Sequence, residues 1–194
     1  MGKGRLEAFS DAVIAIIITI MVLELQAPHG ADWASLSSLI PVFLSYALSF
    51  LFLGIYWNNH HHLFQVVRHV DGRVLWANLH LLFWLSLFPF CTGWLGETHF
   101  AARPVALYGV VLLLAACAYY VLTGALLPLH GKDSTLAVAL GSDVKGRASI
   151  AVYVGAIGAS FFSPWLAYGL YVVVAIAWLI PDRRMERALA ERRA

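Results

Sequence analysis

The sequence predicts an all-α, polytopic integral membrane protein with six transmembrane helices in each subunit. The 194-residue chain is 61% hydrophobic and only 12% charged, and its mean hydropathy is +0.76, which is unlike an ordinary soluble domain. The apolar residues fall into six long runs. At about 20 residues per crossing, these runs leave no room for a soluble domain of typical size. The basic residues gather in segments that would lie on one side of a membrane.

The runs divide the chain into a six-helix membrane domain, residues 1–181, and a cytoplasmic C-terminal tail, residues 182–194, in which acids and bases alternate. The first run is too long for a signal peptide and lacks a small-residue cleavage pattern, so we expect it to be retained. Pro89 predicts a kink in the third helix, and Gly155 and Gly158 predict a close helix contact in the fifth. The six helices are expected at residues 6–27, 37–62, 73–96, 104–127, 147–162 and 165–181.

The distribution of positive charge predicts the orientation of the chain. The sequence contains 13 Lys and Arg residues. If the N-terminus is cytoplasmic, all of them except Arg103 fall in inner segments, which favours an even number of crossings with both termini in the cytoplasm. Topology therefore accounts for the basic residues, and they give no reason to expect nucleic-acid binding.

The first helix carries an apolar stripe. At about 100° per residue, Ile16, Thr19, Ile20 and Leu23 fall on one face, and Asp11 points away from it. A carboxylate is costly in lipid, so Asp11 is expected to meet partners inside a bundle. Periodicity alone favours a helix-packing surface, with Thr19 bonding back to the carbonyl four residues earlier, over a pore lining.

A motif opens this helix. It reads Arg5-x-x-x-Phe9-Ser10-Asp11 and is followed by Ala-Ile-x-Ile-Thr-Ile and then Leu-Glu-Leu. The pattern closely resembles the signature of the transmembrane protein 175 family of potassium channels, and in particular its short prokaryotic members. The resemblance implies six helices per subunit and a tetramer in which the first helix of each subunit lines the pore. It favours the pore interpretation of the stripe.

The resemblance also implies roles for single residues. It places the main hydrophobic constriction at Ile16, and the next apolar layers fall on Ile20 and Leu23. Thr19 matches a threonine layer linked to potassium preference, since hydroxyls can replace part of an ion's water. Glu24, near the outer end, would either raise the cation concentration at the mouth or lie at the interface.

A polar cluster ends the second predicted helix, with Trp57 followed by three consecutive histidines. By topology this end lies beside Arg5. A tryptophan followed by paired histidines also resembles the family, in which such residues help to hold the inner end of the first helix. The expected structural network comprises Arg5, Phe9, Ser10, Asp11, Trp57, His60 and His61.

The implied function is passive conduction of potassium, modestly selective over sodium, in the plasma membrane of a prokaryote. The partners would be the lipid bilayer, potassium ions and further copies of the chain. Family members of the human type carry two six-helix repeats, so a single repeat would need about four copies, a homotetramer. No cofactor is expected beyond the permeant ion.

Two other functional classes remain open. Asp11 and Glu24 could exchange protons in a proton-coupled secondary transporter, although transporter sites usually lie at the membrane midplane rather than near helix ends. His60 and His80 could hold haem. Consecutive histidines on a helix point about 100° apart and cannot share one ion, so no metal site is expected. The sequence shows no catalytic motif, which predicts that the protein is not an enzyme.

Overall fold

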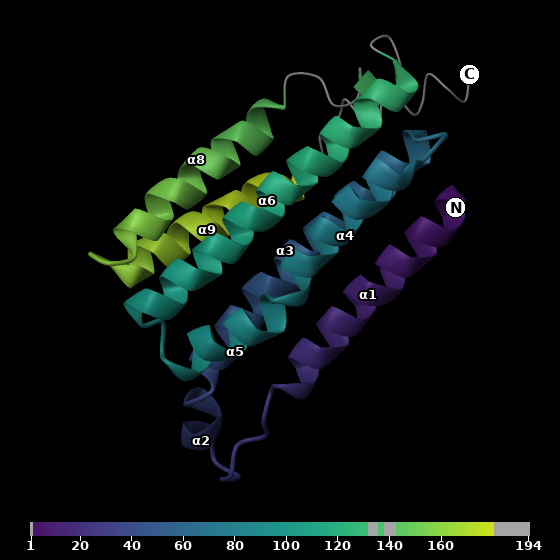
Figure 1. The fold of residues 1–194 in the computed structure, drawn as a ribbon. Coiled ribbons are helices and arrows are strands. Elements are labelled where there is room, and N and C mark those ends of the chain that lie inside the picture. Colours follow the sequence, from purple (N-terminus) through teal and green to yellow (C-terminus); the bar gives the residue numbers. More distant parts are fainter. Residues whose placement is uncertain (1, 132–135, 138–142, 181–194) are drawn as a thin grey trace.

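The fold consists of helices (Figure 1). The structure is a computed structural model that describes residues 2–131, 136–137 and 143–180, and no β-strand occurs among them. The tail predicted at residues 182–194 lies outside the described residues. The helices are α1 (Lys3–Leu23), α2 (Trp33–Ser37), α3 (Ile40–Val66), α4 (Gly72–Ser86), α5 (Phe88–Glu97), α6 (Ala102–His130), α8 (Val144–Ala159) and α9 (Pro164–Leu179).

Four helical segments are long and apolar enough to cross a membrane. They are α1, α3, the combined α4–α5 segment Gly72–Glu97, and α6. Helices α8 and α9 contain 16 residues each. At about 1.5 Å per residue each is about 24 Å long, a little less than the hydrocarbon core. The all-helical membrane architecture therefore agrees with the prediction.

The segment between the first two long helices differs from the prediction. Helix α1 ends at Leu23 rather than at residue 27, because Glu24 already caps it and Pro28 restricts the residue before it to extended conformations. Helix α3 begins at residue 40 rather than 37, with Pro41 in its first turn. The short α2 lies between them. Asp32 caps α2 by accepting from the Ser35 N–H at 2.7 Å.

The predicted kink in the third membrane segment is present. Helices α4 and α5 meet at Leu87, and Pro89 stands in the first turn of α5. Proline has no N–H, and its ring excludes the carbonyl four residues earlier. At the junction, the Leu87 N–H donates to the carbonyl of Trp84, three residues earlier, at 3.3 Å. A bond of this spacing forms a 3₁₀-type turn, which is tighter than an α-helical turn, before α5 begins.

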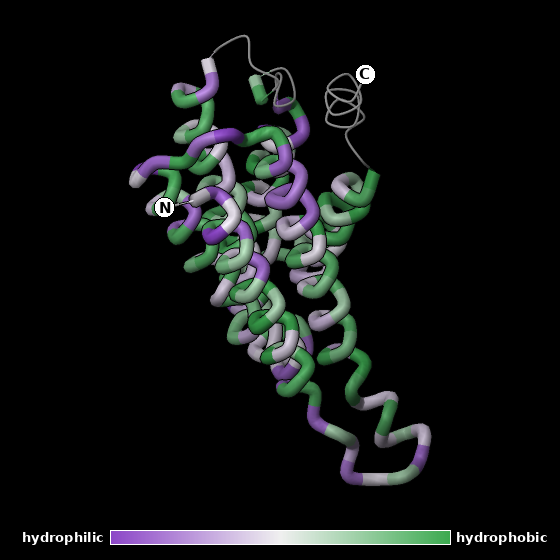
Figure 2. The backbone as a smooth tube through the Cα atoms, turned by 90° about the vertical axis from the view of Figure 1, so that its right-hand side faces the viewer, coloured by the Kyte–Doolittle hydropathy of each residue, from purple (hydrophilic) through white to green (hydrophobic). Residues whose placement is uncertain are grey.

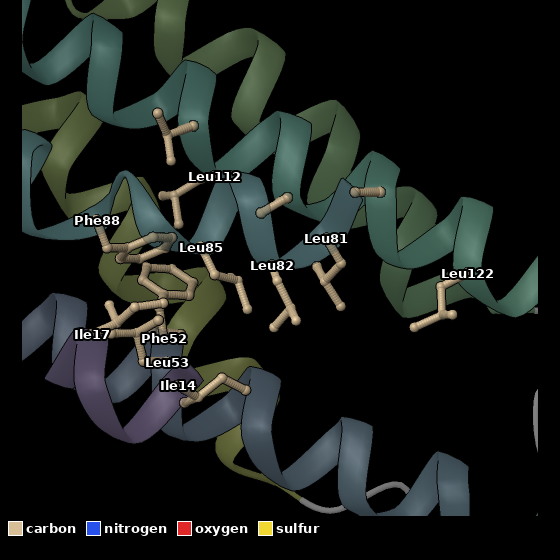
Figure 3. Packing of buried hydrophobic residues seen from close by; sticks show 14 of the residues in the cluster. Ile14, Ile17, Phe52, Leu53, Leu81, Leu82, Leu85, Phe88, Leu112 and Leu122 are labelled. Carbon is tan, nitrogen blue, oxygen red and sulfur yellow. The ribbon is translucent and has the colours of Figure 1, made fainter. Parts of the chain in front are cut away.

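The interior is filled by apolar side chains from α1, α3, α4, α5, α6, α8 and α9, and part of this cluster is drawn in Figure 3. Lipid tails are as apolar as leucine, so close packing rather than water exclusion has to hold the helices together within a membrane. The labelled side chains are Ile14 and Ile17 of α1, Phe52 and Leu53 of α3, Leu81, Leu82 and Leu85 of α4, Phe88 of α5, and Leu112 and Leu122 of α6.

The close backbone approaches occur at glycines that the sequence did not single out. A Cβ added at Gly96 would collide with α3, and one added at Gly109 would collide with the ring of Tyr171. Gly155 and Gly158 have nothing within 4 Å of such an atom. The prediction of a close helix contact at Gly155 and Gly158 is therefore wrong for contacts among the described residues of one chain.

Helix α1 lies at one edge of the molecule, where it contacts α3, α4 and α5 (Figure 1). Helices α8 and α9 lie together on the other side of the bundle, against α6 and α3. The middle of the bundle is hydrophobic, and hydrophilic residues gather towards its two ends (Figure 2). One face of α1 is consequently left largely uncovered by the part of the chain that the structure describes.

Candidate pore helix and its polar anchors

Helix α1 has one buried and one exposed face. The buried face, formed by Leu6, Ser10, Ile14, Ile17 and Met21, packs into the bundle. The residues of the predicted stripe lie on the exposed side. Ile16 is 57%, Ile20 42% and Leu23 79% exposed, and Thr19 is also exposed. Large apolar side chains therefore cover a face that nothing in the described part of the chain contacts.

Thr19 donates its hydroxyl hydrogen to the Ala15 carbonyl. This is the back-bonding that a threonine on a packing surface would also make. The bond uses the hydrogen but leaves lone pairs on the oxygen. The geometry is therefore compatible with a cation approaching the exposed face.

A buried hydrogen-bonded chain anchors the N-terminal half of α1. The Asn78 side chain on α4 donates from Nδ2 to Ser10 Oγ at 2.9 Å, and its Oδ1 lies 2.8 Å from His60 Nε2 on α3. Ser10 in turn donates to the Leu6 carbonyl at 2.9 Å. Ser10, Asn78 and His60 are at most 2% exposed. Three helices are thus joined by polar side chains in an otherwise apolar setting.

A second set of contacts joins α1 to α3 at the surface. The Trp57 indole N–H donates to Asp11 Oδ1 at 3.1 Å. The Trp57 ring stacks on His61, with centroids 5.8 Å apart, and His61 Nε2 lies 2.8 Å from the Gln65 side-chain nitrogen. The structure therefore brings together five members of the predicted network, namely Ser10, Asp11, Trp57, His60 and His61.

Two members of the predicted network stand apart. Arg5 and Phe9 are both exposed, and neither contacts this cluster among the described residues. Asn78 and Gln65 are the participants that sequence reasoning missed. An amide in the middle of an apolar helix was the available signal for Asn78.

The C-terminal end of α1 faces an open groove. Glu24 lines it together with Glu97 and the α5 residues around Trp94, and its volume is about 490 Å³. Both carboxylates are exposed. At the start of α2, hydrogen bonds from Ser35 hold the pKa of Asp32, the N-cap residue, below its ordinary value.

A buried hydroxyl cluster supports the C-terminal half of α1. Thr92 of α5 donates to Ser49 of α3 at 2.6 Å, and Ser49 lies 2.9 Å from the Tyr108 hydroxyl of α6. Thr92 Oγ1 also lies 3.8 Å from the sulfur of Met21 on the buried face of α1. Sequence reasoning missed this cluster, since isolated Ser, Thr and Tyr residues in apolar runs carry no spacing signal.

The histidines proposed for haem have separate partners. His60 is buried against Asn78 and Phe64. His80 is exposed and accepts from the Trp84 indole N–H at 2.9 Å. Within the part of the chain that the structure describes, no group of three or more His, Cys, Asp or Glu side chains is arranged to hold a metal ion.

Apolar helices of spanning length, polar anchors between them and one helix with a bare outer face define a polytopic membrane protein of the ion-channel type. The chain belongs to the TMEM175 family. The sequence model described as the endosomal/lysosomal potassium channel TMEM175 matches residues 5–89.

Relatives similar over the full chain support this assignment. A potassium channel of Chryseobacterium sp. (strain P1-3) is 56% identical over 98% of this chain and 100% of its own length. The crystal structure of a lysosomal potassium-selective channel TMEM175 homolog from Chamaesiphon minutus superposes with a TM-score of 0.81 at 30% identity, covering 92% of this chain and 96% of that one. The human relative, named an endosomal/lysosomal proton channel, is 38% identical over 35% of this chain and 16% of its own length.

Proposed function

We propose that the protein is a passive potassium channel whose pore is lined by α1 from each of about four identical subunits. Six crossings per subunit are supplied by α1, α3, the kinked α4–α5 pair, α6, α8 and α9. The protein would reside in a prokaryotic plasma membrane with both termini in the cytoplasm. The names of the bacterial relatives, which are called potassium channels, support potassium as the permeant ion.

The observation that carries the proposal is the exposed stripe of α1. The exposed face of α1 carries three large apolar side chains, those of Ile16, Ile20 and Leu23. Buried hydrogen bonds anchor the opposite face to the bundle. Around a symmetry axis these side chains would form rings narrow enough to dewet. Ile16 would be the main constriction, and the Thr19 oxygens would replace part of the hydration shell of potassium, giving modest selectivity over sodium.

The anchors suggest how such a pore is kept in shape. Ser10 and Asp11 tie the inner half of α1 to α3 and α4, and Met21 lies against the outer hydroxyl cluster. The width of the pore would then follow from how far these anchors allow neighbouring α1 helices to stand apart. Glu24 would raise the local cation concentration at the outer mouth.

The test is ion flux in liposomes containing the purified protein, under a potassium gradient and then a sodium gradient. Ile16→Asn should raise flux and weaken the preference for potassium, and Thr19→Ala should weaken the preference alone. Val173→Asn is the matched control, because Val173 is 60% exposed on α9, far from α1. Equal effects at Ile16 and Val173 would refute the α1 pore.

A proton-coupled carrier is the alternative, and the vertebrate relatives named as proton channels make proton movement worth measuring. Asp11 and Glu24 lie thirteen residues apart, about 20 Å along the helix, so they cannot share one midplane site. The carrier hypothesis would be favoured over the channel if potassium flux saturates, requires a proton gradient and is unchanged by substitution of Ile16.

A further inference from the structure

A small cavity lies between α3, α6, α8 and α9, on the side of the bundle away from α1. Its volume is about 50 Å³, enough for a few water molecules. None of its lining residues belongs to the candidate pore or its anchors. Its walls are mainly aromatic, and they include Phe52, Tyr56, Tyr119, Tyr120, Tyr153 and Trp178.

Tyrosine hydroxyls without partners line this cavity. Tyr153 is only 2% exposed, yet its hydroxyl has no hydrogen-bond partner among the described residues, and the same is true of Tyr56. The Tyr119 hydroxyl donates to the Asn59 carbonyl at 3.3 Å and retains acceptor capacity. Among the described residues the one fully buried side-chain nitrogen or oxygen without a partner is His62 Nδ1, so the tyrosine hydroxyls are open to the cavity and free to bond to a molecule that occupies it.

The cavity also holds one negative charge. Asp143 lines it and accepts from the Gly146 N–H at 3.0 Å, which caps α8. The nearest lysine in the sequence, Lys145, donates from Nζ to the Ile180 carbonyl at 2.9 Å and lies 5.1 Å from the ring centroid of Trp178, which is one wall of the cavity. The carboxylate has no salt-bridge partner within the described residues.

We propose that this cavity binds an ammonium group, primary or methylated, with its charge directed at Asp143. Aromatic faces attract such cations, and N–H donors on the ligand would satisfy the tyrosine oxygens. A hard metal cation fits less well, since it requires a shell of several oxygen ligands and most of this wall is ring carbon. The volume limits the ligand to a headgroup-sized cation.

Two sources could supply this chemistry, a free amine or the amine headgroup of an inner-leaflet lipid. A groove of about 210 Å³ adjoins the cavity and shares the walls formed by Ile55, Asn59 and Trp178. It continues between α3 and α9 past Phe50 and Gly54. An acyl chain could lie in it while its headgroup occupies the cavity.

The test uses the full-length protein in detergent and saturation-transfer NMR titrations. The probes are methylammonium, tetramethylammonium, choline, and 3,3-dimethylbutan-1-ol, which is the uncharged isostere of choline. We expect the cations to bind and the alcohol to bind at least about tenfold more weakly, which corresponds to the loss of one charge-assisted contact. Equal binding of choline and the alcohol would overturn the proposal.

Two substitutions sharpen this test. Asp143→Asn keeps a side chain that caps α8 well and should weaken choline binding about tenfold. Tyr153→Phe should weaken the binding of methylammonium, because its N–H groups can donate to the Tyr153 hydroxyl. The binding of tetramethylammonium, which has no N–H, should be unchanged. Asp32→Asn is the control, because Asp32 lies in α2, outside this cavity. Unchanged binding to the Asp143 variant would contradict the assignment.

The source of the ammonium group is distinguished by native mass spectrometry of protein released from nanodiscs of phosphatidylethanolamine and phosphatidylglycerol. Retention of phosphatidylethanolamine by the wild type, and its loss in Asp143→Asn, identifies a lipid headgroup. Equal retention by both proteins, combined with methylammonium binding that depends on Asp143, identifies a free amine. Neither measurement involves ion flux, so its outcome is independent of the proposed channel.

Discussion

Asn78 of α4 joins α1 to α3 through one buried amide. Its amide donates to Ser10 and lies within hydrogen-bond distance of His60, and all three side chains are buried. The sequence identified Ser10 and His60 as members of a network but did not identify their common partner. Partner choice across helices depends on how the helices pack, which one sequence does not specify.

Replacing Asn78 by Leu should destabilise the protein by about 1 kcal/mol, within the range measured for interhelical hydrogen bonds in membranes. Ser10 keeps its bond to Leu6, but the His60 imidazole loses its partner at Nε2. Unfolding titrations in mixed detergent and dodecyl sulfate would measure the loss. Asn58→Leu, at an exposed amide on α3, is the control, and an equal loss there would contradict the assigned role.

His130 forms a contact that depends on its protonation state. Its Nε2 accepts from the Arg68 N–H at 2.8 Å and the His69 N–H at 3.4 Å, and its Nδ1 lies 2.9 Å from the Leu126 carbonyl. Only the neutral tautomer with the proton on Nδ1 makes all of these bonds. The end of α6 therefore holds the α3–α4 loop through an unprotonated imidazole.

Acidification should release this loop. A second proton would place an N–H on Nε2 against the backbone N–H donors of Arg68 and His69. Amide exchange of the peptide around Arg68, corrected for intrinsic rates, should be faster in acidic than in neutral buffer. His130→Gln, which stays neutral, should remove this pH dependence. A dependence that persists in the variant would assign it to His69.

At the scale of whole elements, the long apolar runs and the proline kink were predictable because length, hydropathy and the geometry of Pro89 are local properties. Helix α2 was not predicted, since five residues capped by Asp32 leave no periodic pattern. The tight glycine contacts were also missed. Small-residue spacing marked Gly155 on α8, whereas the contact forms at Gly109, where the bulk of Tyr171 determines the fit.

Gly109→Ala should therefore disrupt the packing of α6 against α9 and α8. The added methyl group meets Tyr171 and Ile157, and such overpacking typically costs about 1–3 kcal/mol. Gly155→Ala is the matched change, because it has open space around it and should be neutral or slightly stabilising through helix propensity. Thermal denaturation in detergent measures both variants. If Gly155→Ala is the more damaging, α8 packs against another subunit.

At the scale of the whole molecule, one edge exposes both apolar side chains and a carboxylate. Leu23 is 79% exposed on α1, and the same edge carries Asp11 with its Trp57 partner. Lipid would suit the leucine but not the carboxylate. Contact with further copies around a hydrated axis suits both. The number of copies is a property of the interface between chains, so neither composition nor periodicity could predict it.

Cysteine cross-linking tests this arrangement directly. In a background with the native Cys91 and Cys117 replaced, Leu23→Cys should form disulfide-linked dimers on oxidation, because α1 helices around one axis bring equivalent residues close enough to bridge. Ile176→Cys, at a 54% exposed position on α9, should remain monomeric on a non-reducing gel. The two side chains are comparably apolar and exposed, so chance collision in the membrane would link both. Linkage at residue 176 alone would place α9 at the subunit interface and leave α1 facing lipid.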